Sequence, residues 1–398
     1  MSKSLFYFVI SLLFSGCVQQ TGHMKKEQSD FITIDFEQCY NTEQQMMISE
    51  IADQVEYIEL KTPNDIIISR IMDVIHFDDY LIIKSRSIVY LFHKNGDFIC
   101  QVGSRGQGPG EYDYVYSVEF DFHKKEIIIS DYFQLLFYDL EGKFLRNRNV
   151  RSLELGLSDS ILWMAEIIST ANRQKFLAFA SLLDGEGDSI AYIQNTLYGV
   201  INSERQSYIS YPYTSFFYHK NNVLYFKGDT SNDTIWEISG LNTRPHAFIN
   251  MGKFKLPWEH EAWISRDEFD RNREKYRMVP SIVEDDNYFY LYTRSRNSID
   301  RIPVDLKYIV YDKTKKRGFS AKDNQYIGLT DDILGGPPLW PFWISDEYYI
   351  NAIESFELLE KVKTGIYSPS HSLKELLSRI GEDTNQLLIL CHKKMFNK

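Results

Sequence analysis

The chain has 398 residues and a formal net charge of −11, and because this acidic balance repels phosphate groups it excludes nucleic acid as a partner. Hydrophobic residues make up 43% of the chain and charged residues 25%, which is a globular composition with enough apolar surface for a core. Aromatic residues reach 15%, and because Tyr and Phe suit half-buried pleated surfaces, this bias favours strands over helices.

The N-terminus carries an export pattern. Lys3 precedes an apolar stretch from Leu5 to Phe14, and Ser15-Gly16-Cys17 follows. The stretch is shorter than the ~20 residues that a membrane-spanning helix needs, but it fits the apolar region of a signal peptide. Small residues directly before a cysteine resemble the lipobox of bacterial lipoproteins, although Phe14 stands where leucine is most usual. The resemblance implies lipid attachment at Cys17; the alternatives are secretory cleavage without a lipid and an ordinary apolar N-terminus.

The segment after Cys17 differs from the rest of the chain. Residues 18–30 (VQQTGHMKKEQSD) are polar and show no hydrophobic periodicity, as is typical of a flexible linker. The sequence therefore predicts a lipoprotein signal peptide over residues 1–16, a tether over residues 17–30 and one folded domain over residues 31–398.

From residue 31 onward, short alternating or apolar runs are separated by Gly, Asp and Asn, a pattern that predicts strands joined by turns. No alternation of strands with long helices appears, which disfavours a parallel α/β sheet. Two segments are predicted to be helices, Trp258–Met278 and Ser372–Ile380, the second with Ser372 and Glu375 as a capping box. The predicted strands include Phe31–Ile34, Val55–Leu60, Tyr80–Ile83, Ile88–Phe92, Ile127–Ile129, Leu135–Tyr138, Val223–Phe226, Thr234–Ile238, Tyr288–Tyr292, Tyr308–Tyr311, Tyr348–Ile350 and Leu387–Leu390.

One segment of the chain repeats visibly. Tyr80–Cys100 matches Glu126–Arg146 without a gap at a displacement of 46 residues, and each copy has a hairpin glycine, Gly96 or Gly142. Weaker copies lie later in the chain. A period of roughly 40 to 50 residues with several antiparallel strands per unit is typical of a β-propeller.

Further segments make the resemblance more specific. Gly103–Tyr112 (GSRGQGPGEY) looks like part of an NHL-type propeller repeat. Ile51–Leu60 (IADQVEYIEL), Asp233–Ile238 (DTIWEI), Gly335–Pro341 (GGPPLWP) and Asn385–Leu390 (NQLLIL) extend the match over nearly all of the chain after the tether. The chain resembles the six-bladed β-propeller lipoprotein family of Gram-negative gut anaerobes. The resemblance implies an all-β, six-bladed β-propeller with short helical insertions, and it implies no activity.

A closed ring of blades needs one strand from the start of the chain to complete the last blade. Phe31–Ile34 and Val55–Leu60 are the two candidates for pairing with a strand of that blade, which would remove free sheet edges. The cysteines predict no disulfide framework or zinc site, because none lies in a C-x-x-C. With Cys17 lipidated, an odd number remains, namely Cys39, Cys100 and Cys391, so at least one is a free thiol.

The glycine-rich stretch Gly103–Gly110 is the first place to look for phosphate binding. It fails the Walker pattern, because Pro109 and Gly110 stand where Lys and Ser/Thr are required. One interpretation is a tight crossing between two blades. The other is a loop at the central channel that presents Arg105 and Glu111 to a ligand, and these two residues are the candidate ligand-binding residues.

Other patterns point to no specific chemistry. The nine histidines are scattered and none forms H-E-x-x-H, although single histidines on separate blades could meet at a metal. The adjacent pairs Asp78-Asp79, Asp285-Asp286 and Asp331-Asp332 are better explained as turns than as catalytic pairs, because neighbouring strand residues point to opposite faces. Asp184, Glu186 and Asp188 fail the calcium-loop pattern at Ser189 and Asn195.

The sequence therefore predicts no cofactor, no metal and no catalytic residue. The favoured hypothesis is a propeller anchored to the cell envelope, on its periplasmic or outer-membrane side, that binds a glycan, a peptide or an envelope protein. The alternative is a carbohydrate-active hydrolase or lyase with a site at the mouth of the channel. A third hypothesis is a scaffold that joins envelope proteins.

Overall fold

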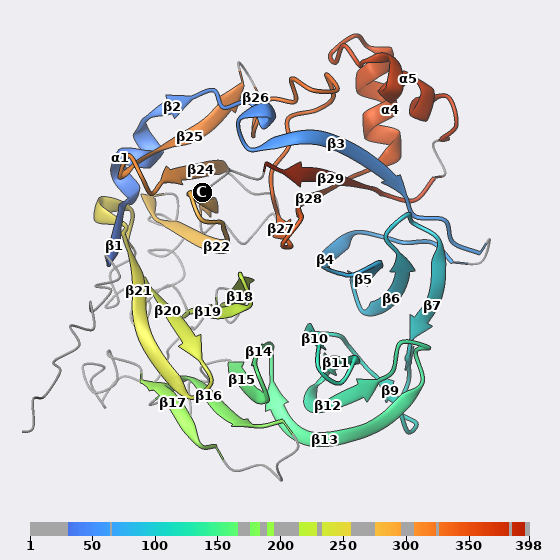
Figure 1. The fold of residues 1–398 in the computed structure, drawn as a ribbon, viewed down its shortest axis with the longest axis vertical. Coiled ribbons are helices and arrows are strands. Elements are labelled where there is room, and N and C mark those ends of the chain that lie inside the picture. The colour runs from blue at the N-terminus through green and yellow to red at the C-terminus, as the bar shows by residue number, and fades with distance from the viewer. Residues whose placement is uncertain are drawn as a thin grey trace, which may run out of the picture. The chain divides into compact units, whose positions relative to one another are not determined.

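Six β-sheets stand in a ring around a central axis (Figure 1). The computed structural model describes residues 31–63, 66–165, 176–183, 189–194, 215–228, 233–255, 275–295, 306–323, 326–381 and 384–394. The predicted signal peptide, the tether and Cys17 lie outside these residues, and the sheets belong to the unit that spans Phe31–Lys398. The ring confirms the predicted fold class, an all-β six-bladed β-propeller.

Each blade is a sheet of at least four strands, which follow one another from the axis outward. Blade 1 contains β4 (Ile71–Phe77), β5 (Tyr80–Ser85), β6 (Ile88–His93) and β7 (Phe98–Val102). Blade 2 contains β10 (Ser117–Asp121), β11 (Glu126–Ser130), β12 (Tyr132–Tyr138) and β13 (Phe144–Ser152). Blade 3 contains β14 (Glu154–Ser158), β15 (Ile161–Ala165), β16 (Phe176–Leu182) and β17 (Ala191–Gln194). Blade 4 contains β18 (Phe216–Lys220), β19 (Val223–Lys227), β20 (Thr234–Ser239), β21 (Asn242–Asn250) and β1 (Ile32–Asp35). Blade 5 contains β22 (Arg277–Glu284), β23 (Tyr288–Ser295), β24 (Lys307–Asp312), β25 (Arg317–Asp323), β2 (Glu43–Gln44) and β26 (Tyr326–Ile327). Blade 6 contains β27 (Trp343–Ile344), β28 (Tyr348–Ile353), β29 (Leu387–Lys393) and β3 (Ala52–Glu59).

The second strand of a blade is apolar at consecutive positions because both of its faces are buried. In β11, Ile127 and Ile129 pack in the core between blades 1 and 2, whereas Ile128 packs in the core between blades 2 and 3. All three side chains are fully buried. Successive residues of a strand point to opposite faces, so an uninterrupted apolar run marks a sheet that is covered on both sides.

The repeated segments found in the sequence form equivalent parts of blades 1 and 2. Tyr80–Cys100 contains β5, β6 and the start of β7, and Glu126–Arg146 contains β11, β12 and the start of β13. The hairpin glycines have positive φ angles, 86° at Gly96 and 75° at Gly142. At Gly96 a Cβ atom would also lie 2.0 Å from the carbonyl oxygen of Glu59, so glycine is required there for space as well.

The N-terminal part of the domain closes the ring. Strand β3 pairs antiparallel with β29, with Val55 opposite Cys391, which confirms the second of the two predicted closing strands. The first one does not close the ring, because β1 pairs parallel with β21 of blade 4, with Ile34 opposite Ile249. Since β2 pairs with β25 of blade 5, the segment from β1 to β3 covers outer edges of three consecutive blades.

The helices differ from the predicted ones. The cap of helix α5 (His371–Leu377) lies two residues before the predicted one, because Ser370 rather than Ser372 accepts a hydrogen bond from a first-turn amide, that of Leu373. Arg277 and Met278, predicted to end a helix, lie in β22, and residues 256–274 lie outside the described part of the chain. The sequence did not predict α1 (Phe36–Asn41) or α4 (Ser355–Lys363). In the described part of the chain, no helix is long and apolar enough to cross a membrane.

Cys39, Cys100 and Cys391 are free thiols, as expected for a domain with a large core. Cys39 and Cys391 are buried, and burial raises the pKa of each thiol to about 12. Both thiols are therefore protonated and unreactive at neutral pH.

Candidate functional site

The innermost strand of each blade faces the axis of the propeller; these strands are β4, β10, β14, β18, β22 and β27 (Figure 1). Phe77 at the end of β4 stacks on Phe120 near the end of β10, with ring centroids 3.8 Å apart. Lys84 of β5 lies opposite Asp73, near the start of β4, in the register of these two strands. Its side chain donates a hydrogen bond to the carbonyl oxygen of Tyr116, just before β10. The inner strands therefore run side by side in one direction. We call the face on which they begin the start face and the other the end face.

Three ionisable residues gather at the start face. Asp73 lies on β4, Lys84 on β5 and Glu154 is the first residue of β14, so the residues come from blades 1 and 3. Each side chain is half-buried. Trp343 of β27 donates a hydrogen bond to Asp73 and connects this group to blade 6. We call Asp73, Lys84 and Glu154 the start-face cluster.

The environment of the start-face cluster alters its titration. Burial raises the pKa of Glu154 to about 8, against the opposing charge of Lys84, and the charge of Asp73 raises it further. Burial also raises the pKa of Asp73, while it lowers the pKa of Lys84. At neutral pH Glu154 is therefore mostly a neutral carboxyl, which can both donate and accept hydrogen bonds.

Deeper along the axis, blades 2 and 4 meet in an ion pair. Glu119 of β10 and His219 of β18 are 3.1 Å apart between Oε2 and Nε2. Glu119 also accepts hydrogen bonds from the amides of Phe120 and Leu157, and it is buried, whereas the side chain of His219 is 37% exposed. Burial alone would lower the pKa of His219, but the charge of Glu119 and its hydrogen bond raise it overall. A titratable cation therefore remains in contact with solvent at the axis.

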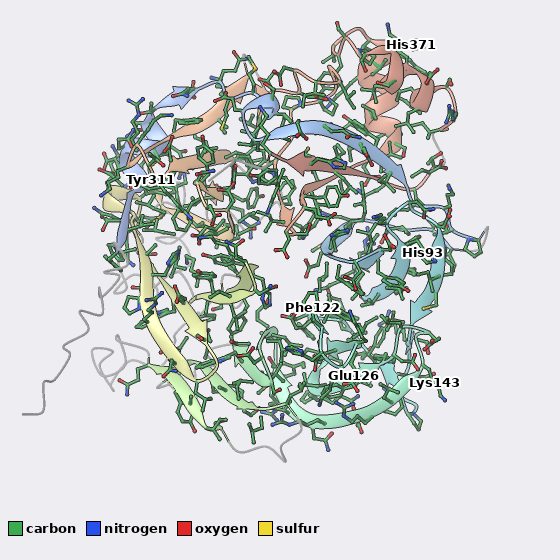
Figure 2. All side chains as sticks on the ribbon, viewed as in Figure 1. His93, Phe122, Glu126, Lys143, Tyr311 and His371 are labelled. Atoms are coloured by element: carbon green, nitrogen blue, oxygen red, sulfur yellow. The ribbon has the colours of Figure 1, made fainter. Side chains whose placement is uncertain are left out.

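An aromatic side chain marks the end face. Phe122 follows β10, is 48% exposed and lies on the inner side of its blade (Figure 2). Its ring contacts Phe120 with centroids 5.1 Å apart and Phe77 with centroids 6.1 Å apart. Beside these rings on the end face, Lys125 forms an exposed ion pair with Asp78, 3.1 Å apart.

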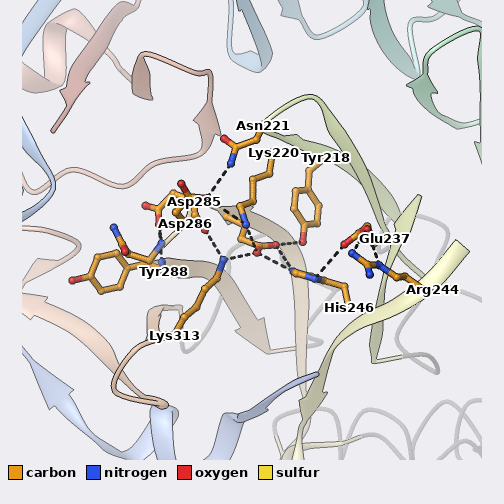
Figure 3. Close-up of polar contacts among 12 residues, drawn as sticks. Tyr218, Lys220, Asn221, Glu237, Arg244, His246, Asp285, Asp286, Tyr288 and Lys313 are labelled. Carbon is orange, nitrogen blue, oxygen red and sulfur yellow. Dashed lines mark hydrogen bonds and ion pairs between the residues drawn. The ribbon is translucent and has the colours of Figure 1, made fainter. Parts of the chain in front are cut away.

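A buried ionic network joins blades 4 and 5 (Figure 3). At its centre, Glu284, the last residue of β22, is completely buried. Its carboxylate lies 2.9 Å from His246 Nε2, 2.5 Å from Lys313 Nζ and 3.4 Å from Lys220 Nζ. It also accepts a hydrogen bond of 2.8 Å from the hydroxyl of Tyr218. The carboxylate therefore has partners on β18, on β21 and in the turn after β24.

These partners keep Glu284 ionised. Burial alone would raise its pKa, but the hydrogen bond from His246 and the charges of Lys313, His246 and Lys220 lower it to about 2. Burial lowers the pKa of Lys313, although the charge of Glu284 opposes this effect. Since every group in the network is paired and the carboxylate is closed to solvent, we assign the network a structural role.

In two of the three adjacent acidic pairs, the buried aspartate, Asp285 or Asp331, accepts hydrogen bonds from backbone amides and so orders a turn, as predicted. Asp285 accepts hydrogen bonds from the amides of Asn287 and Tyr288, both at 2.6 Å. The hydroxyls of Tyr290 and Tyr349 donate to the same carboxylate. Asp331 accepts from three backbone amides of the turn that follows it, those of Ile333, Leu334 and Gly336.

Arg105 and Glu111 lie in the crossing from β7 to β10, on the short parallel strands β8 (Ser104–Arg105) and β9 (Glu111–Tyr112). Figure 1 places β9 beside β7 and β13, away from the inner strands. Glu111 accepts a hydrogen bond of 2.7 Å from the amide of Gly108, and Arg105 lies 3.4 Å from the exposed carboxylate of Asp113. The structure therefore does not bring these two residues to the start-face cluster, and ligand binding by them stays a prediction.

The sequence did not predict the residues at the axis. The visible repeat begins at β5 and β11, the second strands of their blades, so the inner strands β4 and β10 lie outside it. The one local signal is a charged residue inside an apolar strand, such as Asp73 in Ile71–Phe77 or Glu119 in Ser117–Asp121. Among the described residues, the structure shows no group of three or more His, Cys, Asp or Glu side chains placed to hold a metal ion. The acidic residues of segment 184–188, which fail the calcium-loop pattern, lie outside the described part of the chain.

The fold and the axis define the chain as a β-propeller whose inner strands carry ionisable residues. The chain belongs to the family described as "Domain of unknown function (DUF4934)", whose model matches residues 31–392. Among solved structures, the chain is similar to a protein from Bacteroides fragilis described as exported, with 18% identity and a TM-score of 0.64 over 92% of this chain and 100% of that one. It is also similar to a member of the DUF4221 family from Bacteroides vulgatus, with 13% identity and a TM-score of 0.49 over 86% of this chain and 97% of that one. No curated protein sequence matches the chain significantly.

Proposed function

We propose that this protein is a lipoprotein of the cell envelope whose propeller binds a ligand or a partner protein at the start face. The observation that carries the binding function is the start-face cluster. Asp73 and Glu154 lie on the inner strands of two blades and Lys84 lies on the second strand of blade 1; all three are half-buried ionisable groups, which cost free energy in an apolar core and are therefore candidates for a functional site. The likeness of the fold to a protein described as exported supports a location in the envelope. The lipobox at Cys17 and the resemblance of Gly103–Tyr112 to NHL-type repeats belong to the same proposal.

The anchor is tested by replacing Cys17 with serine. We expect the wild-type chain to sediment with membranes and to incorporate labelled palmitate during growth, because the thiol of Cys17 carries the lipid. The Cys17→Ser variant should lose both properties. The measurement is the fraction of protein in the membrane pellet before and after detergent, together with the incorporated label.

Cys100→Ser is the matched control for the anchor, because Cys100 is a half-buried free thiol of the propeller. This variant should remain in the membrane pellet and keep its label. A Cys17→Ser chain that still incorporates palmitate would show that the lipid is attached elsewhere.

Binding at the start face is tested with Glu154→Ala. Titration calorimetry of the purified propeller against soluble polysaccharides, peptides and poly-lysine should show at least one ligand. The variant should bind that ligand about two- to tenfold more weakly, since a hydrogen bond to a neutral group contributes about 0.5–1.5 kcal/mol. A ligand that binds wild type and variant equally would place the binding site elsewhere.

A second candidate function, a carbohydrate-active hydrolase or lyase, is favoured by one observation. Burial raises the pKa of Glu154 to about 8, close to the value that a general acid needs at neutral pH, and Asp73 is a neighbouring carboxyl. Release of new reducing ends from a polysaccharide, abolished by Glu154→Gln, would establish this activity. It would overturn the proposal of a domain that only binds.

A further inference from the structure

Blade 2 exposes a row of aromatic rings on the start face. Tyr114, Tyr116, Tyr132 and Phe133 contact one another in sequence, with ring centroids 4.9, 5.9 and 4.8 Å apart. Phe133 is 63% exposed and Tyr114 is 43% exposed, whereas Tyr116 and Tyr132 are half-buried. We call these four residues the aromatic ridge. Exposed aromatic rings in contact with one another mark an interaction site more strongly than single exposed residues do.

The backbone under the aromatic ridge is strained. Tyr132 has a φ of 77°, and it is the only aromatic residue with a positive φ in the described part of the chain. Asp131 holds this conformation, because its Oδ1 accepts hydrogen bonds from the amides of Phe133 and Gln134 at 3.2 and 3.1 Å. A bulky residue in this region costs about 1–3 kcal/mol, and such strain is concentrated at functional sites. The strained residue, Tyr132, therefore lies in the turn that exposes the side chain of Phe133.

The aromatic ridge continues into the start-face cluster. Lys84 donates a hydrogen bond to the carbonyl oxygen of Tyr116, so the ridge and the cluster share this contact. Tyr116 directly precedes β10, and Glu154 begins the neighbouring inner strand β14. A ligand lying along the start face of blade 2 would therefore meet ring surfaces first and ionisable groups next to the axis.

The charges beside the aromatic ridge select against highly charged ligands. The guanidinium of Arg151 lies 5.7 Å from the ring centroid of Phe133 and repels a cation from that end. The exposed pair of Arg105 and Asp113, 3.4 Å apart, lies next to Tyr114 and places both signs of charge together. The net charge of −11 disfavours a polyanion. A ligand that fits is uncharged, apolar on its faces and rich in hydroxyl groups at its edges.

We propose that the aromatic ridge and the start-face cluster together bind a neutral glycan chain. The proposal rests on the binding function proposed above and names its ligand class. The C–H bonds on the face of a sugar ring carry partial positive charge and pack against the electron-rich face of an aromatic ring. The hydroxyl groups of the sugar are neutral donors and acceptors, which match the carboxyl groups of Asp73 and Glu154 and the ammonium group of Lys84. Binding of a glycan by these contacts requires no covalent step.

The test is affinity electrophoresis of the purified propeller in gels that contain one polymer each. The neutral polymers are xyloglucan, galactomannan, arabinoxylan and pullulan, and the charged ones are heparin and poly-lysine. We expect at least one neutral polymer to retard the wild-type protein. Phe133→Ala and Tyr114→Ala should each weaken the apparent affinity by about tenfold or more, as removal of an aromatic anchor does at other interfaces.

Phe356→Ala is the matched control, because Phe356 is a phenylalanine of α4 with a similar exposure of 53%. It should leave the retardation unchanged. All of these substitutions remove exposed side chains, so the thermal unfolding midpoint serves to verify that each variant is folded.

The outcomes separate this inference from the proposed function. Retardation by a neutral polymer that survives both ridge substitutions overturns the role of the aromatic ridge while the binding function stands. Binding only to heparin, to poly-lysine or to a protein partner overturns the glycan class, again without touching the binding function. Absence of any ligand in both the gels and the calorimetry overturns the two proposals together.

Discussion

Replacement of Glu284 by glutamine will destabilise the propeller by about 3–5 kcal/mol at neutral pH, the range measured when one partner of a buried ion pair is removed. Glu284 is the completely buried anion of the network between blades 4 and 5. Without its charge, Lys220, Lys313 and His246 face one another with no central counter-charge. The expected result is a lower urea midpoint with the slope of the transition unchanged.

The same residue predicts how stability depends on pH. The folded pKa of Glu284 is about 2, below the ordinary value of 4.5. A carboxyl whose folded pKa is lowered contributes stability that is complete above its unfolded pKa and is lost as the pH falls toward the folded pKa. The contribution of Glu284, about 3 kcal/mol for this difference in pKa, should therefore be present above pH 4.5 and disappear between pH 4.5 and about 2. Glu284→Gln should make this part of the acid unfolding profile flatter.

Glu375→Gln is the matched control for Glu284. The side chain of Glu375 is 57% exposed and lies 3.5 Å from that of His371, on the surface of α5. An exposed pair of this kind contributes little to stability, so the urea midpoint should change only slightly at any pH. Equal losses for the two substitutions would contradict the central role of Glu284.

Replacement of Ile389 by alanine will cost about 2–5 kcal/mol and will loosen the closure of the ring. Ile389 is completely buried in β29, opposite Tyr57 of the closing strand β3. Its side chain belongs to the core that blades 5 and 6 share. Because β3 is the strand that joins the N-terminal part of the domain to the last blade, a cavity at Ile389 weakens the contact that keeps the blades in a ring.

Hydrogen–deuterium exchange measures where the ring opens. In Ile389→Ala the amides of β3 and β29 should exchange faster than in the wild type, while the amides of β11 in blade 2 should change least. Ile67→Ala is the control, because Ile67 is 82% exposed and its truncation leaves no cavity. Uniformly faster exchange in all six blades would show that the ring unfolds as one unit and that closure is not a separate step.

The strands could be predicted from the sequence because neighbouring blades pack against both faces of each sheet. A strand such as β11, with Ile127, Ile128 and Ile129 divided between two cores, must be apolar at every position, and this local pattern is visible without a structure. The hairpin glycines were visible for a similar reason, since the positive φ of Gly96 and Gly142 is a requirement of the turn itself.

Helix boundaries were predicted less well, because several residues satisfy the same local rule. Ser370 and Ser372 are both suitable caps for α5, and the structure uses Ser370, whose backbone amide donates a hydrogen bond to the carbonyl of Leu334. That contact joins residues 36 positions apart and leaves no trace in the pattern around the helix. The choice between the two candidate closing strands, β1 and β3, also depended on contacts between distant residues, because both strands have an alternating pattern in the sequence.

The short alternating runs, the repeat of 46 residues and the turn residues by themselves determined that the chain is a β-propeller, because each of these features expresses a local requirement of a strand or a turn. Only the tertiary structure decided which residues meet at the axis. Asp73, Lys84 and Glu154 come from three strands of two blades, and they become neighbours only when the ring closes. A charged residue in an inner strand looks the same in the sequence whether it faces the axis or a solvated edge, so the site depends on the distances that the fold imposes.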